Sequence, residues 1–177
     1  RHTKYPEGLK LLKIQGKLKN KLSKIKILLS DVDGVLTDGG MYFTENGLVM
    51  KKFNVKDGMG SVKLREKGFE VGIITTDTSP MAKIRSERLN QEHIIIGTWE
   101  KKKAAEEICS KKGLSLENIA FIGDDVNDLE LLKAVGFSAA PKDAVPQILD
   151  CVDYVCKKKG GDGCFREIAD MLLCVNK

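Results

Sequence analysis

Two aspartates separated by one residue, Asp31 and Asp33, follow a short apolar run that begins at Ile27. Side chains alternate between the two faces of a strand, so both carboxylates start on the same side. Two carboxylates this close stay ionised only when a cation or hydrogen-bond donors stabilise them. Carboxylate oxygens of this kind suit Mg²⁺. Alone, an Asp-x-Asp-Gly segment is more often an acidic turn after a strand, so other residues must decide its chemistry.

Further polar clusters occur where predicted strands end or the next helix begins. A threonine at a strand end is usually a cap, and a lysine run is usually a solvated helix face. The acidic cluster is more informative, because three acids around one helix start repel each other unless a cation is present. The clusters are Thr75, the run Lys101–Lys103, and the acids Asp124, Asp125 and Asp128.

Together these residues could transfer a phosphoryl group to water. That reaction needs a nucleophile, a proton donor for the leaving oxygen, a cation and donors for the phosphoryl oxygens. Asp31 could attack phosphorus as a covalent nucleophile. Asp33 could protonate the leaving alcohol and later activate water. Thr75 offers a hydroxyl and backbone amides near a helix N-terminus, which suit an anion.

The remaining charges would neutralise the phosphate and hold the metal ion. One lysine of Lys101, Lys102 and Lys103 would face the phosphoryl oxygens. Asp124 would supply a further magnesium oxygen, and the two acids behind it, Asp125 and Asp128, would support it.

Strands and helices alternate along the chain from Asp57 onward. This alternation predicts an α/β fold with a Rossmann-like parallel sheet and helices on both faces. Ligands of such sheets bind beyond the carboxyl ends of the strands, where the polar clusters fall. The predicted strands are Phe69–Ile74, Ile94–Ile96 and Ile119–Ile122, and the clearest helices are Ser79–Leu89 and Lys101–Lys111.

A β-hairpin is predicted directly after the first strand. Met41–Phe43 and Leu48–Phe53 are extended apolar segments, and Asn46-Gly47 between them is a tight-turn signal. The resulting flap, at about residues 38–54, could overhang the acidic loop.

The net charge of +5 is concentrated at one end of the chain. Residues 1–26 hold nine Lys or Arg against a single acid, Glu7, which leaves the remainder at −3. We interpret residues 1–25 as a basic leader or linker, with a membrane-surface helix as the alternative, and residues 26–177 as one domain. No basic, aromatic-rich surface in the body predicts nucleic-acid binding, and no apolar run is long enough to cross a membrane.

The cysteines and histidines exclude several other kinds of site. Five cysteines without a Cys-x-x-Cys pair indicate reduced thiols in a cytoplasmic protein. With His2 and His93 as the complete set of histidines, a three-histidine zinc site is excluded, and a Ser-His-Asp triad is poorly supported.

The order Asp-x-Asp, Thr, Lys, Gly-Asp-Asp-x-x-Asp resembles the haloacid dehalogenase superfamily of phosphatases over about residues 25–175. The resemblance implies that Asp31 is the nucleophile, that Asp33 is the general acid/base, and that Thr75 binds the phosphoryl group. It further implies that Asp31, Asp124 and the Asp33 backbone carbonyl hold Mg²⁺. The family's spacing favours Lys101 among the three lysines.

Three longer segments resemble a narrower group, the small capless sugar-acid phosphatases. They are Asp33–Gly39, Lys52–Gly58 and Lys159–Glu167. Such enzymes act on 3-deoxy-D-manno-octulosonate 8-phosphate or nine-carbon sialic-type 9-phosphates. The resemblance implies a homotetramer in which the hairpin and the glycine-rich segment Gly160–Arg166 help close a neighbour's site.

The residues after Thr75 depart from the octulosonate pattern. Those enzymes usually read Thr-Gly-Arg, whereas this chain reads Thr75-Thr76-Asp77. An acid at the third position resembles the nine-carbon-acid enzymes, and it slightly favours a nine-carbon 9-phosphate. Thr76 and Asp77 are therefore candidate substrate-binding residues, with Arg85, Arg88 and Arg166 as possible partners for substrate acids.

We therefore expect a magnesium-dependent phosphomonoesterase that forms an aspartyl-phosphate intermediate. The alternative is a non-catalytic C-terminal assembly domain of an acylneuraminate cytidylyltransferase, in which such residues degenerate. All five expected catalytic positions are intact here, which argues against that alternative. A phosphoacceptor receiver domain would place its acids and lysine in another order.

Overall fold

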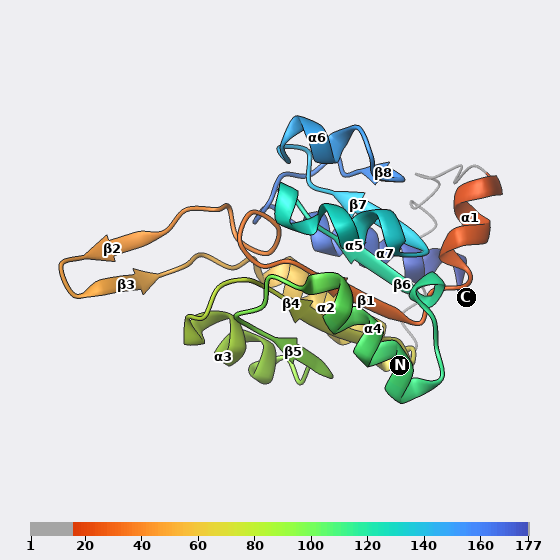
Figure 1. The fold of residues 1–177 in the computed structure, drawn as a ribbon, viewed down its shortest axis with the longest axis horizontal. Helices are drawn as coiled ribbons and strands as arrows, with labels where there is room; N and C mark the ends of the chain where they lie inside the picture. The colour runs from red at the N-terminus through yellow and green to blue at the C-terminus, as the bar shows by residue number, and fades with distance from the viewer. Residues whose placement is uncertain (1–15, 177) are drawn as a thin grey trace.

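A computed structural model describes residues 16–176 of the chain, and its centre is a six-stranded parallel sheet (Figure 1). The strand order is β5-β4-β1-β6-β7-β8, and every pairing is parallel. This confirms the predicted Rossmann-like α/β fold. The strands are β1 Ile27–Ser30, β4 Glu70–Ile74, β5 His93–Ile95, β6 Ile119–Ile122, β7 Phe137–Ala140 and β8 Tyr154–Val155.

Helices cover both faces of the sheet, which places the core in two layers (Figure 1). Leu28 of β1 faces a layer that α2 and α7 complete, whereas Ile27 and Leu29 face a layer that α4 and α5 complete. The alternation of one strand between two apolar layers is the physical reason for its uninterrupted apolar sequence. The helices are α1 Gly16–Leu22, α2 Val55–Glu66, α3 Pro80–Arg88, α4 Lys101–Lys112, α5 Leu129–Ala134, α6 Pro146–Leu149 and α7 Cys164–Val175, with short 3₁₀ turns at Leu116–Asn118 and Val126–Asp128.

The hairpin forms as predicted after β1 and projects from the body of the domain (Figure 1). Its strands are β2 Tyr42–Thr44 and β3 Gly47–Met50, and Thr44 pairs with Gly47. The turn therefore falls at residues 45–46, one position earlier than the predicted Asn46-Gly47. Gly47 is the first residue of β3 and lies just after the turn. Its φ of +108° is one that only glycine adopts without strain.

The end of the basic leader lies against the domain. Leu22 of α1 and Ile25 are buried in the layer that α7 completes, and the Asn176 side chain donates to the Leu22 carbonyl at 3.3 Å. Lys21 pairs with Asp153 at 2.6 Å. Residues 1–15 of the predicted leader lie outside the described residues. Over residues 16–176, no helix has the length and apolar character needed to cross a membrane.

Candidate active site

The acidic loop begins where β1 ends and turns back sharply on itself. The Asp31 amide continues the sheet by donating to the Ile122 carbonyl at 2.9 Å, and the amides of Leu36 and Thr37 both bond the Val32 carbonyl. Gly34 has a φ of +86° and lies against the Asp124 carboxylate, where any Cβ atom would overlap an oxygen. Glycine at this position therefore lets the acidic loop approach Asp124.

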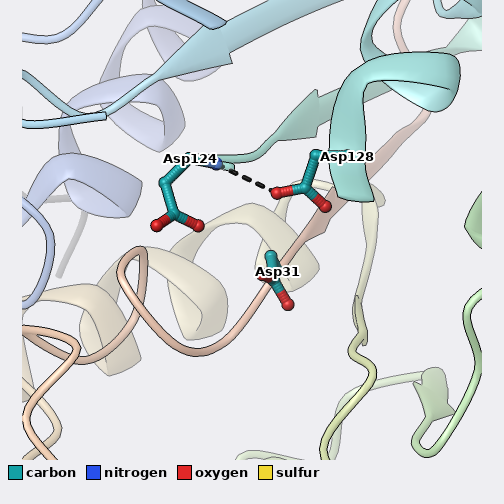
Figure 2. A group of neighbouring side chains, drawn as sticks. All are labelled: Asp31, Asp124 and Asp128. Carbon is teal, nitrogen blue, oxygen red and sulfur yellow. Dashed lines mark hydrogen bonds between the residues drawn. The ribbon is translucent and has the colours of Figure 1, made fainter. Parts of the chain in front are cut away.

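Lys101 joins the acidic loop to the second acidic cluster. It begins α4, only 2% of its surface is exposed, and its Nζ lies 3.0 Å from Asp31 Oδ1 and 2.6 Å from Asp128 Oδ1. The other Asp128 oxygen accepts a hydrogen bond from the Asp124 amide at 3.0 Å (Figure 2). Lys102 and Lys103 form surface ion pairs with glutamates. Of the three candidate lysines, the fold brings Lys101 to Asp31.

Asp31, Asp124 and Asp128 form a cluster that could hold a metal ion (Figure 2). One oxygen of each lies within 4.8 Å of the others. Asp124 Oδ1 is buried without a hydrogen-bond partner, and Asp31 Oδ1 has the Lys101 ammonium nearby but no aligned hydrogen bond. A buried carboxylate oxygen without any donor, as on Asp124, fits a hard divalent cation. Asp128 is already engaged by Lys101 and the Asp124 amide, so Asp31 and Asp124 have the freer oxygens.

The pKa values of the clustered aspartates also favour a bound cation. Burial, followed by the charges of Asp31, Asp128 and Asp125, raises the pKa of Asp124 to about 8. Burial and the charge of Asp128 raise the pKa of Asp31 to about 6, against the opposing effect of Lys101. Near neutral pH, this cluster would therefore take up protons unless a cation replaced them.

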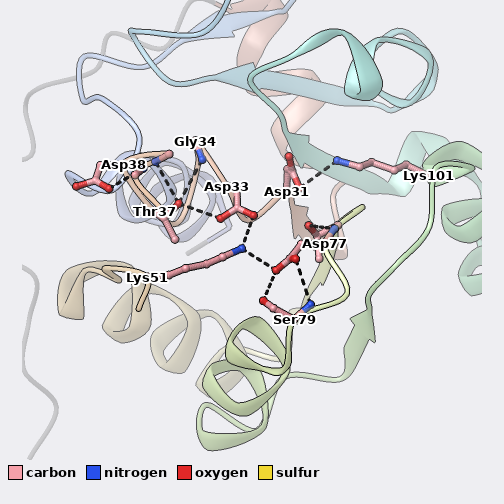
Figure 3. A network of polar contacts seen from close by, with 12 residues as sticks. Asp31, Asp33, Gly34, Thr37, Asp38, Lys51, Asp77, Ser79 and Lys101 are labelled. Atoms are coloured by element: carbon pink, nitrogen blue, oxygen red, sulfur yellow. Dashed lines mark hydrogen bonds and ion pairs between the residues drawn. The ribbon is translucent and has the colours of Figure 1, made fainter. Parts of the chain in front are cut away.

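Asp33 is held by a residue that the sequence reasoning missed, Lys51. Lys51 follows β3, its side chain is fully buried, and its Nζ lies 2.6 Å from Asp33 Oδ2 and 2.6 Å from Asp77 Oδ2 (Figure 3). Burial lowers the pKa of Lys51, but its bonds to the two acids outweigh this and raise it overall. The only signal in the sequence was the pair of adjacent lysines after the predicted second strand of the hairpin. Side chains alternate between the two sides of an extended segment, so one of two adjacent lysines faces inward.

Thr75 and Asp77 form the loop beyond β4. The Thr75 amide extends the sheet by donating to the Ile95 carbonyl at 3.0 Å, and its hydroxyl accepts from the Asp77 amide at 3.2 Å. Asp77 accepts from the Ser79 amide and hydroxyl as well as from Lys51. A cleft of about 280 Å³ lies at this edge of the sheet, and it is lined by Asp31, Asp33, Met41, Thr75, Thr76, Asp77, Asp124, Asp125 and Asn127.

The three arginines expected near the substrate lie outside this cleft. Arg85 lines a separate small pocket with Asp57 and Gly58, between α2 and α3. Arg88 is exposed near the end of α3. Arg166 pairs with Asp170 on its own helix at 2.8 Å. Within one chain, Thr76 and Asp77 are therefore the predicted substrate residues that reach the cleft.

The glycine-rich segment supports the acidic loop of its own chain. The Gly161 amide donates to the Val35 carbonyl at 3.0 Å, and the Asn54 side chain donates to the Gly161 carbonyl at 3.1 Å. A side chain at Gly160 would overlap the Gly34 carbonyl oxygen. Because Gly160 has no side chain, its backbone can pack directly against the backbone of the acidic loop at Gly34.

Comparisons with known proteins agree with this geometry. The sequence model of a haloacid dehalogenase-like hydrolase family matches residues 64–168. The chain is 37% identical to the 3-deoxy-D-manno-octulosonate 8-phosphate phosphatase of Haemophilus influenzae over 88% of this chain and 87% of that protein. It is 38% identical to the Escherichia coli K12 enzyme of the same name, over 86% of this chain and 81% of that protein.

Solved structures show the same similarity in three dimensions. A structure of 3-deoxy-D-manno-octulosonate 8-phosphate phosphatase from Moraxella catarrhalis, in complex with magnesium, phosphate and 3-deoxy-D-manno-octulosonate, superposes with a TM-score of 0.88. It is 34% identical and the match covers 91% of this chain and 92% of that one. The cobalt-bound Haemophilus influenzae enzyme superposes with a TM-score of 0.85 at 37% identity, covering 88% and 91%. The fold, the placement of the acids and these similarities together show that the chain belongs to the haloacid dehalogenase-like hydrolase family.

Proposed function

We propose that this protein hydrolyses the phosphate monoester of a 2-keto-3-deoxy sugar acid, with Mg²⁺ as cofactor and an aspartyl-phosphate intermediate. The observation that carries the proposal is the position of Asp31 in the cleft, between the Lys101 ammonium and the Asp124 carboxylate. Asp33 lies on the same loop and lines the same cleft. A nucleophile and a proton donor are thus available to one bound phosphate.

The first step transfers the phosphoryl group to the enzyme. An Asp31 oxygen forms a bond to phosphorus while the bond from phosphorus to the sugar oxygen breaks. Asp33 gives its proton to that leaving oxygen, so the product leaves as a neutral alcohol. Thr75 binds the phosphoryl oxygens through its hydroxyl, and the Lys101 ammonium offsets their charge.

The second step returns the enzyme to its starting state. Asp33, now a carboxylate, takes a proton from water as the water oxygen bonds to phosphorus. The bond between phosphorus and the Asp31 oxygen breaks, which releases inorganic phosphate and restores the carboxylate. Each proton that Asp33 donates is therefore recovered in the same catalytic cycle.

Asp31, Asp124 and the Asp33 backbone carbonyl would hold Mg²⁺, with Asp125 and Asp128 as supporting acids. When bound, the ion would neutralise charge on the phosphoryl oxygens and reduce the repulsion between these carboxylates. The supporting role is consistent with the contacts of Asp128, which orients Lys101 and the Asp124 amide.

The identity of the sugar acid depends on the residues beside the phosphate position. The curated relatives are named for octulosonate 8-phosphate, which supports an eight-carbon substrate. Asp77, in place of the arginine usual in those enzymes, slightly favours a nine-carbon 9-phosphate. Contacts from Arg85, Arg88 and Arg166 to substrate acids stay a prediction.

A phosphate-release assay tests this proposal directly. Octulosonate 8-phosphate, a sialic-type 9-phosphate and p-nitrophenyl phosphate are compared with Mg²⁺ and with a chelator. We expect turnover that requires the metal ion and is fastest for one sugar acid. Absence of turnover with all three would refute the proposal and favour a non-catalytic assembly domain, which the similarity to named phosphatases does not support.

Assembly into a homotetramer is part of the same proposal, with the hairpin and residues 160–166 closing a neighbour's site. The exposed apolar side chains of the hairpin support it, since Phe43 is 65% and Val49 is 54% exposed. Light scattering of the purified protein would give the mass, and a monomer would exclude closure by a neighbour. We also propose a cytoplasmic location, because the five cysteines form no disulfide.

A further inference from the structure

Lys51 is the one buried charge that the flap contributes to the cleft edge among the residues described. The hairpin strands β2 and β3 carry exposed side chains, yet the Lys51 side chain immediately after them is fully buried. Its Nζ lies 2.6 Å from an oxygen of Asp33 and 2.6 Å from an oxygen of Asp77. Figure 3 shows Lys51 reaching between these two acids, so one ammonium group joins three separate segments of the chain.

Both oxygens of Asp33 are held by donors. Lys51 contacts Oδ2, and the Thr37 hydroxyl contacts Oδ1 at 3.3 Å. The Thr37 oxygen already accepts from the amides of Gly34 and Gly39, so its own hydrogen is directed to Asp33. The carboxyl plane of Asp33 is therefore fixed from two sides, with the shorter contact on the Lys51 side.

Asp77 holds the Lys51 ammonium from the side opposite Asp33. Its Oδ1 accepts from the Ser79 amide at 3.1 Å, and its Oδ2 accepts from Lys51 and from the Ser79 hydroxyl. Asp77 is thus held at the start of α3, and Lys51 is held by Asp77. The ammonium group cannot follow movements of Asp33 without breaking a second short contact.

A stabilising role alone does not explain the burial of Lys51. Removing a lysine and two carboxylates from water carries a desolvation cost that the ion pairs offset only partly, so such a network is weak support for stability. Lys51 contacts Asp33, the residue that delivers a proton to the leaving oxygen in the proposed function. Lys51 is therefore placed to control the orientation of that proton donor.

We propose that Lys51 is a positioning residue, which holds Asp33 where its carboxyl group gives a proton to the leaving oxygen and later takes one from water. This inference rests on the proposed function. Lys51 touches neither phosphorus nor the leaving oxygen in this role. Its contact with Oδ2 and the Thr37 contact with Oδ1 together fix the orientation of the Asp33 carboxyl group. Because Lys51 belongs to the flap, the flap contributes to proton transfer as well as covering the cleft.

The test compares esters that differ in their need for a proton donor. Phenyl phosphate and p-nitrophenyl phosphate are similar in size, but p-nitrophenolate leaves more readily without protonation. The value of kcat/KM reports steps up to departure of the leaving group. Lys51→Met should lower it for the sugar-acid phosphate by about 10- to 100-fold. The loss should be clearly larger with phenyl phosphate than with p-nitrophenyl phosphate.

Lys24→Met is the matched control, because Lys24 lies outside the flap and the cleft, is 64% exposed and pairs with Glu117 at the surface. It should retain wild-type kcat/KM with every ester. Equal losses of Lys51→Met on the two aryl esters, no loss, or a loss confined to KM for the sugar acid would each overturn the inference. If circular dichroism shows that Lys51→Met does not fold, Lys51→Gln is compared in the same way. An inactive wild-type protein would instead count against the proposed function.

Discussion

Asp124 makes the metal-free protein less stable as the pH rises. An unfolded aspartate has a pKa near 3.8, whereas burial and neighbouring acids raise the pKa of Asp124 in the folded protein to about 8. Between these values, the folded state keeps a proton that the unfolded state has lost. Stability is therefore complete at low pH and falls as the pH rises toward 8. The raised pKa of Asp31, about 6, acts in the same direction over a narrower range.

The size of the effect follows from the proton balance. One proton corresponds to about 1.4 kcal/mol for each pH unit, so Asp124 alone should cost about 2.5 kcal/mol between pH 5 and pH 7. For a domain of this length, that corresponds to a fall in Tm of about 5–10 °C. Thermal unfolding with a chelator, followed by circular dichroism, measures it. Adding Mg²⁺ should restore most of the loss at pH 7, because the ion binds the folded protein.

Asp124→Asn separates this explanation from general effects of pH. The variant should be more stable than wild type at pH 7 without metal, should show a shallower pH dependence, and should gain little from Mg²⁺. Glu87→Gln is the control, since Glu87 is exposed on α3 and forms a surface pair with Lys83. A wild-type Tm that stays level or rises from pH 5 to pH 7 without metal would refute the reasoning, as would an unchanged slope in Asp124→Asn.

Three further substitutions test the site. Asp31→Asn should abolish magnesium-dependent phosphate release while leaving the circular dichroism spectrum unchanged, and full activity would end its assignment as nucleophile. Lys101→Met should lower kcat by about 100-fold or more, because it removes the ammonium beside Asp31. Lys102→Met is the control and should keep activity near that of the wild type, since Lys102 pairs with a glutamate at the surface. Equal activities of the two variants would contradict the assignment of Lys101. Gly160→Ala should lower the free energy of unfolding by about 1–3 kcal/mol in urea, because its methyl group overlaps the Gly34 carbonyl, and unchanged stability would show that the segment can move aside.

Three residues of the site, Asp31, Thr75 and Asp124, could be predicted because each follows a strand of one parallel sheet. Asp31 follows β1, Thr75 follows β4, and Asp124 lies just beyond β6. These three strands are neighbours, with β1 between β4 and β6, so local strand endings converge in space. Parallel pairing brings all carboxyl ends to one edge.

The positions of the arginines could not be predicted in this way. A helix presents its residues around a full circle, and which face meets the cleft depends on how the helix packs. Arg85 of α3 faces α2 and lines a small pocket with Asp57 and Gly58 instead of reaching the cleft. Arg166 lies on α7 and is engaged by Asp170 one turn further along the same helix.

By itself, the sequence determined the α/β alternation, the hairpin after the first strand and the set of acids at the strand ends, because these depend on short-range periodicity and turn chemistry. Only the tertiary structure decided that Lys101 reaches Asp31, that Gly160 packs behind the acidic loop, and that Lys51 joins Asp33 to Asp77. Those contacts join residues that are between 18 and 126 positions apart in the sequence. They depend on how strands, helices and flap pack together, which no local pattern specifies.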